Sequence, residues 1–177
     1  MDNPLPHQLP EHLPRLWRFA LRLARDRHDA EDLVQRTCVR ALERQLQWQA
    51  GTALLSWLFA IEHSIWLNEL RSAQRRRTGS LDGDAADLEC TIAATHGNPE
   101  LSLHYRQVIG AVEALPEAQR VVMLLVAVEG LSYRDTAAVL DVPIGTVMSR
   151  LARARATVGL RFADAPPAQL PRLGAKP

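Results

Sequence analysis

The sequence predicts an all-α fold with two small helical domains joined by a flexible, acidic linker. Two observations carry this prediction. In both halves of the 177-residue chain, apolar residues recur at the three- and four-residue spacing of amphipathic helices, and no sustained strand-like alternation is found. From Thr78 to His104 the chain has no Lys or Arg, whereas basic residues are frequent on either side of that stretch.

The first two helices of the N-terminal half follow from proline and aspartate signals. We expect the first helix to begin near Pro14, because proline is tolerated at the first helical position. The second is expected to start with Asp29 as its N-cap and to continue through "AEDLVQRTCVRALERQ". Its inner stripe contains Ala30, Leu33, Val34, Thr37, Cys38 and Ala41.

A third helix, from about Ala53 to Arg76, follows the turn "QWQAG", in which Gly51 interrupts the helical pattern. The stretch from Thr78 to about Pro99 is rich in Gly, Asp, Ala and Thr and is predicted to be the linker. The inward stripe of the third helix contains Leu54, Leu58, Ile61 and Ile65. A neighbouring strip contains Trp57, Ser64, Asn68, Arg71 and Arg75.

The C-terminal half is again helical. Pro116 opens a helix over "EAQRVVMLLVAV" and Gly130 closes it. Ser132 caps the stretch "YRDTAAVL", and the tight turn "DVP" leads into the last helix. The tail from Ala163 onward is rich in Pro and Ala and is expected to be disordered.

The last helix has two unlike faces. Val147, Leu151, Ala154 and Val158 share one face, which is expected to pack on the preceding helix, and Thr146, Ser149, Arg150 and Arg153 share another. No Asp or Glu stands between Asp141 and Phe162, so no acid within the helix neutralises these arginines. This order is typical of a helix-turn-helix: a short capped helix, a tight turn, and a second helix whose hydrogen-bond donors face outward. The second helix of that motif enters the major groove of DNA. A plain helical hairpin with a solvated basic face is the alternative.

Composition excludes several other classes. The chain has no Gly-rich phosphate loop and no HExxH motif, and its histidines are scattered, so we expect no enzyme, no cofactor and no metal. Cys38 and Cys90 form no CxxC pair, which favours a reduced, cytoplasmic chain. The segment "MDNPLPHQLPEHLP" lacks the features of a signal peptide, and "VVMLLVAV" is too short to span a bilayer, so membrane insertion is not expected.

Three segments resemble the extracytoplasmic-function (ECF) sigma factors of bacterial RNA polymerase. "DAEDLVQRTCVRAL" resembles their region 2.2, "LLSWLFAIEHSIWLNELRSAQRR" their regions 2.3 and 2.4, and "LPEAQRVVMLLVAVEGLSYRDTAAVLDVPIGTVMSRLARARATV" their region 4. The resemblance covers roughly Leu13 to Arg77 and Tyr105 to Leu160. It implies a sigma factor that binds core RNA polymerase and promoter DNA, directs promoter-specific transcription initiation and has an anti-sigma factor as a further partner.

The resemblance also implies a domain division. It gives a disordered N-terminus (1–12), region 2 for polymerase and minus-ten binding (13–77), an acidic linker (78–100), region 4 for minus-thirty-five binding (101–162) and a disordered tail (163–177).

Three sets of site residues are implied by the same resemblance. Polymerase binding is expected of Asp29, Asp32, Leu33, Val34, Gln35, Arg36 and Val39. Minus-ten DNA binding is expected of Trp48, Gln49, Ala50, Gly51, Thr52, Asn68, Arg71 and Arg75. Minus-thirty-five DNA binding is expected of Ser132, Tyr133, Arg134, Thr146, Met148, Ser149, Arg150 and Arg153.

Two of these assignments leave alternatives open, and so does a pair of residues outside the three sets. Trp48 either stacks on an unstacked base or caps the hydrophobic core. Met148 stands where some family members carry Arg, so the base that it faces is recognised by apolar contact or not at all. Glu62 and His63 stand where many relatives are more basic, which leaves the strength of minus-ten binding open.

Two other functions remain as alternatives. One is a two-domain helix-turn-helix regulator whose first half binds a ligand or dimerises. The other is a pure protein-interaction module, which would not need a last helix free of acidic residues. Binding to core polymerase separates the first from a sigma factor, and binding to DNA separates the second.

Overall fold

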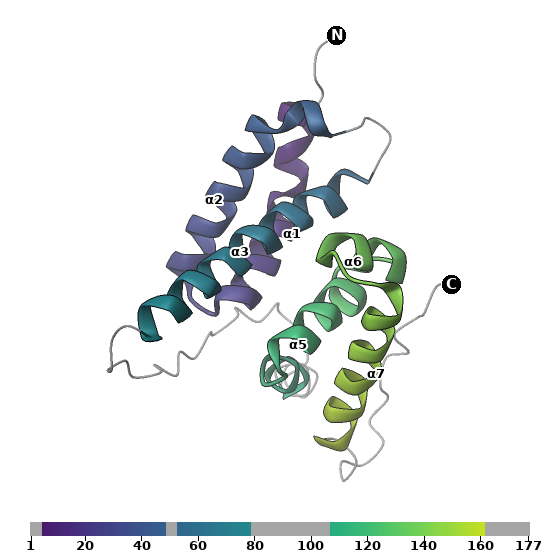
Figure 1. Cartoon of the computed structure of the whole chain (residues 1–177). Coiled ribbons are helices and arrows are strands. Elements are labelled where there is room, and N and C mark those ends of the chain that lie inside the picture. Colours follow the sequence, from purple (N-terminus) through teal and green to yellow (C-terminus); the bar gives the residue numbers. More distant parts are fainter. Residues whose placement is uncertain (1–4, 49–52, 79–106, 162–177) are drawn as a thin grey trace, which may run out of the picture. The chain divides into compact units, whose positions relative to one another are not determined.

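A computed structural model of the chain describes residues 5–48, 53–78 and 107–161 (Figure 1). All regular structure within these ranges is helical, and the chain divides after Thr91 into two compact units. The predicted all-α, two-domain architecture is therefore confirmed. The predicted linker beyond residue 78 and the predicted tail lie outside the described residues. Within the described ranges, no helix combines the length and the apolar character that crossing a membrane requires.

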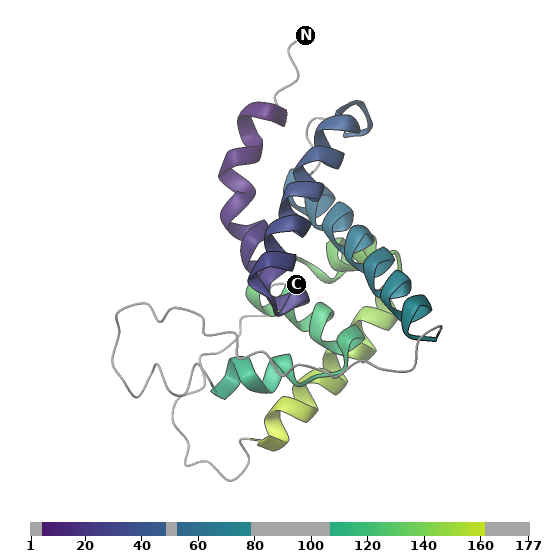
Figure 2. The ribbon, with the colours of Figure 1, turned by 90° about the vertical axis from the view of Figure 1, so that its left-hand side faces the viewer.

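The N-terminal unit is built from three long helices. Figure 2 shows α1 and α2 running side by side, and α3 packs against both of them. The ring of Phe19 from α1 meets the ring of Phe59 from α3 edge to face, with ring centroids 5.0 Å apart, and both side chains are buried. The helical elements of this unit are α1 (Leu5–Ala24), α2 (Arg27–Glu43), the short 3-10 helix η1 (Gln45–Gln47) and α3 (Leu54–Thr78).

The start of α1 corrects two predictions. The helix begins at Leu5, not near Pro14, so the segment predicted as a disordered N-terminus is largely helical. Leu5 and Leu9 are buried and extend the apolar stripe of the helix by two turns. Pro10 and Pro14 lie four residues apart on the exposed side, where water can satisfy the carbonyl groups that lose their backbone donor. The prolines had suggested a boundary, but the buried leucines decide where the helix begins.

The N-cap of α2 is Asp26, not Asp29. The side chain of Asp26 accepts hydrogen bonds from the backbone N–H groups of His28 at 2.8 Å and Asp29 at 2.9 Å. Asp29 therefore lies in the first turn, where a carboxylate favours the positive end of the helix dipole. Arg25 before the cap has φ 61°, a left-handed conformation that ends α1 and turns the chain into α2.

The inward stripes of α2 and α3 are largely as predicted. Leu54, Leu58, Ile61 and Ile65 are buried along α3, and Ala30, Leu33, Thr37 and Ala41 are buried along α2. The hydroxyl of Thr37 donates to the carbonyl of Leu33 at 2.8 Å, which satisfies this polar group inside the core. Val34 and Cys38 are only half-buried. The sequence pattern did not reveal that Glu62 and His63 are also buried.

The environment of Cys38 predicts that its thiol reacts slowly with alkylating reagents. Burial, and then the nearby carboxylate of Glu62, raise the pKa of Cys38 above its usual value. The reactive thiolate is therefore scarce near neutral pH. In a Cys90→Ser variant, we expect alkylation of Cys38 to be much slower than alkylation of a small-molecule thiol and to accelerate when urea unfolds the chain. A folded variant that reacts as fast as the free thiol would contradict this environment.

The C-terminal unit contains a helix–turn–helix hairpin resting on a preceding helix. The described part begins with a helical stretch at 107–113, and α7 packs on both α5 and α6. The predicted helix after Pro116 is present, but its last turn is a π-helix, and Gly130 with φ 72° closes it. The elements named here are α5 (Glu117–Met123), the π-helical turn η2 (Leu124–Val128), α6 (Tyr133–Leu140) and α7 (Ile144–Arg161).

Local signals fix the hairpin between α6 and α7. The hydroxyl of Ser132 accepts a hydrogen bond from the backbone N–H of Asp135 at 3.0 Å and donates one to its carboxylate at 2.6 Å, as expected of the predicted cap. Asp141 ends α6 in the left-handed region with φ 51°, and the N–H of Val142 reaches back to the carbonyl of Ala137 at 3.1 Å. The chain then enters α7 after Pro143, so the two helices are joined by only three residues.

Candidate functional site

The outward face of α2 carries a strip of charged and polar side chains. Asp29, Asp32, Gln35 and Arg36 are exposed, and Val39 is 56% exposed at the end of the same strip. Val34 is half-buried beside them. Leu33 is fully buried, so it supports this face from below and is not available for the direct contact expected of it.

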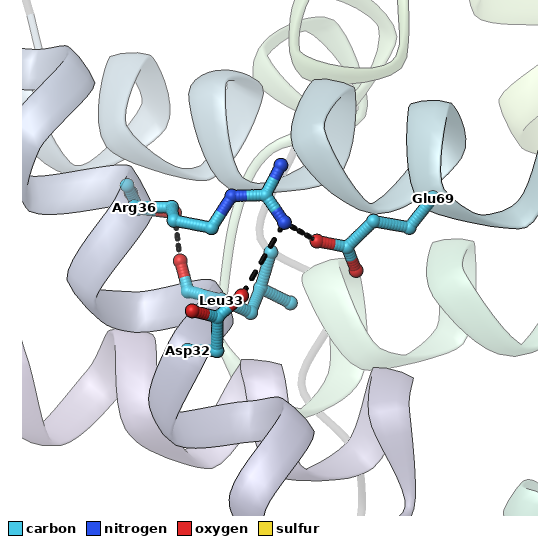
Figure 3. A network of polar contacts seen from close by, with 5 residues as sticks. Asp32, Leu33, Arg36 and Glu69 are labelled. Atoms are coloured by element: carbon cyan, nitrogen blue, oxygen red, sulfur yellow. Dashed lines mark hydrogen bonds and ion pairs between the residues drawn. The ribbon is translucent and has the colours of Figure 1, made fainter. Parts of the chain in front are cut away.

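Arg36 joins this strip to α3. Figure 3 shows its guanidinium reaching between Asp32 of α2 and Glu69 of α3. Its Nη1 atom lies 3.3 Å from the Oδ2 atom of Asp32 and forms an ion pair and hydrogen bond with Glu69. Since the side chains are partly exposed, each pair stabilises the fold by about 1 kcal/mol or less. Their larger effect is geometric, because they hold the charged groups of two helices in one arrangement.

Burial and the neighbouring charges shift the pKa of Glu69. Partial burial raises the pKa of Glu69 above its usual value, the guanidinium of Arg36 opposes that rise, and Asp32 and Asp29 add to it. Glu69 was not among the expected site residues. It lies 33 residues from Arg36 in the sequence, so only the packing of α3 on α2 brings it to this surface.

Exposed apolar side chains occur along the C-terminal part of α2 and in the short helix η1 that follows it. Val39, Leu42 and Leu46 are exposed, and Leu46 is 94% exposed. Single exposed apolar side chains are ordinary, but several in one region are typical of a surface that contacts another molecule. The face of α2 therefore offers charged groups and apolar contact area together.

The polar strip of α3 lies beside an open cleft between α2 and α3. Asn68, Arg71 and Arg75 are exposed. The Nη1 atom of Arg71 lies 3.5 Å from the Oδ1 atom of Asn68. The cleft has a volume of about 180 Å³ and is lined by Arg40, Arg44, Trp57, Ala60, Ile61 and Ser64.

Two cleft residues were missed by the sequence reasoning. Among the described residues, neither Arg40 nor Arg44 finds an acidic partner for its guanidinium. Arg40 lies in the last turn of α2 and Arg44 is its C-cap, and their spacing of four residues could have revealed that they lie on the same side of the helix. Of the expected minus-ten loop, only Trp48 is described, and it is half-buried; Gln49, Ala50, Gly51 and Thr52 lie outside the described residues.

The outward face of α7 is free of acidic groups. Val147, Leu151 and Ala154 are buried, as predicted. Met148, Ser149 and Arg153 are exposed, and Thr146 and Arg150 are half-buried at the edge of the exposed face. Neither Arg150 nor Arg153 pairs its guanidinium with any side chain in the described part of the chain.

The N-terminal end of α6 lies on the same hairpin. Ser132 and Arg134 are exposed, and Tyr133 is half-buried. The first turn of α6 and the arginine-bearing face of α7 therefore belong to one small helix pair, as the sequence predicted for a DNA-binding hairpin.

Comparisons with known proteins agree with this arrangement. The family model described as "Sigma-70 region 2" matches residues 10–76, and the model described as "Sigma-70, region 4" matches residues 105–158. The chain is 35% identical over 143 residues to the ECF RNA polymerase sigma factor EcfG of Rhodopseudomonas palustris, covering 81% of this chain and 76% of that protein.

Two solved structures are also similar. One is the sigma factor RpoE in complex with the anti-sigma factor NepR from Bartonella quintana, with a TM-score of 0.80 and 30% identity; the match covers 93% of this chain and 100% of that chain. The other is CnrH in complex with the cytosolic domain of CnrY, with a TM-score of 0.60 and 25% identity; that match covers 90% of this chain and 88% of that one.

Proposed function

The chain belongs to the extracytoplasmic-function (ECF) sigma factors of bacterial RNA polymerase, and on that premise we propose which surfaces of its two units bind polymerase and promoter DNA. It binds core RNA polymerase and directs promoter-specific transcription initiation. The alternative of a ligand-binding or dimerising regulator is not favoured, because the N-terminal half matches sigma region 2. Sigma factors are regulatory and non-catalytic, and this chain is proposed to have no enzymatic activity of its own.

The face of α2 is the proposed polymerase-binding surface. The observation that supports it is the exposed strip of Asp29, Asp32, Gln35, Arg36 and Val39, with Leu33 holding the helix to the core beneath. Glu69 joins this surface through its ion pair with Arg36. Charged groups at such a surface set orientation and association rate, and the exposed apolar side chains supply contact area.

Removing one carboxylate tests this surface. Asp32→Ala is expected to weaken binding to core polymerase about fivefold or more, as for an interface residue worth over about 1 kcal/mol. The free energy of unfolding should change by only about 0.5 kcal/mol, because Asp32 is exposed and its one ion pair is a surface pair. Binding is measured by titrating labelled core enzyme, and stability by thermal melting.

The matched control is Glu11→Ala, which removes one exposed carboxylate from α1, a different helix of the same unit. It should leave polymerase binding unchanged. Equal binding by Asp32→Ala and wild type, or equal loss in both variants, would contradict the assignment of the strip.

We propose that the minus-ten DNA strand follows the polar strip of α3. Asn68, Arg71 and Arg75 offer donors along one face, and the strip leads to the cleft lined by Arg40 and Arg44. Arginine suits phosphate contacts, and an aromatic wall such as Trp57 suits stacking of an unpaired base. The loop of Trp48, Gln49, Ala50, Gly51 and Thr52 stays part of this proposal through the family resemblance.

We propose that α7 lies in the major groove of the minus-thirty-five element. The supporting observation is the exposed, acid-free face with Thr146, Met148, Ser149, Arg150 and Arg153. We propose that Ser132, the N-cap of α6, and Tyr133 and Arg134 in its first turn contact the DNA backbone beside it, where the first helix of such a hairpin crosses.

The last two parts of the proposal concern the partner that regulates the chain and the compartment in which it acts. The similar RpoE chain is bound to an anti-sigma factor, and we propose an anti-sigma partner for this chain as well. Because core polymerase and the chromosome are in the bacterial cytoplasm, the chain is proposed to act there.

A further inference from the structure

We propose that Ile144 and Met148 form an apolar edge of α7 that recognises thymine methyl groups in the minus-thirty-five element. This inference rests on the proposed placement of α7 in the major groove. It assigns base specificity to two side chains that carry no hydrogen-bonding group, whereas the arginines supply polar contacts from the opposite edge.

The two side chains are unusually exposed for their type. Ile144 is 48% exposed and Met148 is 53% exposed, and both lie in the first two turns of α7. That is the part of a recognition helix that reaches base edges. Residues four apart lie next to each other on a helix surface, so the two form one continuous apolar edge.

The helix sorts its outward residues by type. At about 100° per residue, Ile144 and Met148 fall on one edge, and Thr146 and Arg150 fall nearly opposite them. Small residues, namely Gly145, Ser149 and Ala152, lie on the outer surface between the two edges. A methyl group added at Gly145 would meet nothing within 4 Å, so the fold itself does not require glycine there. A small outer surface instead permits close approach of α7 to the floor of a groove.

The charge of α7 and the apolar character of its edge indicate which molecule covers the edge. No acidic residue stands between Asp141 and Phe162, and the unpaired Arg150 and Arg153 favour an anionic surface. The major groove offers one apolar group on its base edges, the 5-methyl group of thymine. Ile144 and Met148 are separated by about 6 Å along the helix axis, which spans roughly one or two base steps of about 3.4 Å. We therefore expect closely spaced thymines opposite this edge.

The experiment replaces thymine with uracil, which removes only the methyl group. Full-length protein with core polymerase is bound to a duplex carrying a minus-thirty-five element located by mapping transcription start sites. Each thymine of the element is replaced in turn by deoxyuridine. Wild-type holoenzyme is expected to bind about fourfold more weakly for each thymine whose methyl group is buried against the edge.

The variants assign the effect to the edge. Met148→Ala and Ile144→Ala should each reduce the uracil effect at the facing thymine to nearly nothing, and melting should remain close to wild type because both side chains are exposed. The matched control is Leu160→Ala, which removes an exposed apolar side chain at the far end of α7 and should keep the full uracil effect.

Two outcomes overturn the inference. One is wild-type holoenzyme that binds uracil and thymine duplexes equally; the other is a full uracil effect in both edge variants. In each case, continued promoter binding by wild-type holoenzyme leaves the proposed function intact. Failure of the proposed function is distinct, because the holoenzyme would then not bind the thymine duplex at all.

Discussion

Leu151→Ala is expected to destabilise the C-terminal unit by about 2–5 kcal/mol while leaving the N-terminal unit unchanged. Leu151 is only 2% exposed, where α7 packs on α5 and α6, so shortening it leaves a cavity in the small core of that unit. The effect should stay local, because the chain divides into two compact units, each with its own buried residues.

The tryptophans make this prediction easy to measure. All four, Trp17, Trp48, Trp57 and Trp66, belong to the N-terminal unit. In a urea titration, circular dichroism should show helix lost at lower denaturant in Leu151→Ala, whereas the tryptophan fluorescence transition should not move. Leu160→Ala is the control, since Leu160 is 76% exposed on the same helix and should shift neither signal. An equal shift of the fluorescence transition would contradict independent units.

Arg150→Ala is expected to relax sequence preference in the minus-thirty-five element. A bidentate contact between arginine and guanine is worth about 1–3 kcal/mol of discrimination, which is roughly 5- to 150-fold. Arg150 lies nearer the N-terminus of α7 than Arg153, and its guanidinium is not engaged by any other described residue. Arg153→Ala should instead weaken binding evenly across sequences and reduce the salt slope by about one, as loss of a phosphate contact does.

The measurement compares holoenzyme binding to matched and scrambled elements at two salt concentrations. Arg27→Ala serves as the charge-matched control, since Arg27 is an exposed arginine of the N-terminal unit. It should leave discrimination between the two elements unchanged. If Arg150→Ala and Arg153→Ala keep both the affinity and the discrimination of wild type, the arginines form only a solvated face of α7.

Features set by near neighbours in the chain were predictable from the sequence. The cap at Ser132, the turn at Asp141 and the buried stripe of Leu54, Leu58, Ile61 and Ile65 follow from local spacing and appear where they were expected. The start of α1 was not predictable in this way. Proline signals a boundary, and only packing of Leu5 and Leu9 against the rest of the unit overrides it.

Features that depend on packing between helices were missed. Glu69 reaches the α2 surface only because α3 crosses α2 beside Arg36, and no local pattern records that contact. The cleft with Arg40 and Arg44 has the same origin. The burial of Leu33 shows the converse: a motif residue can support a surface from the core without being part of it.

The most direct test is transcription reconstituted from the purified chain, core polymerase and fragments of the chain's own genome. We expect transcripts from a limited set of start sites that share two upstream elements. Asp32→Ala should reduce initiation at all of these sites, and Arg150→Ala should change which sites are used. If no fragment is transcribed and the chain does not co-purify with core polymerase, the account of this protein as a promoter-directing sigma factor is contradicted.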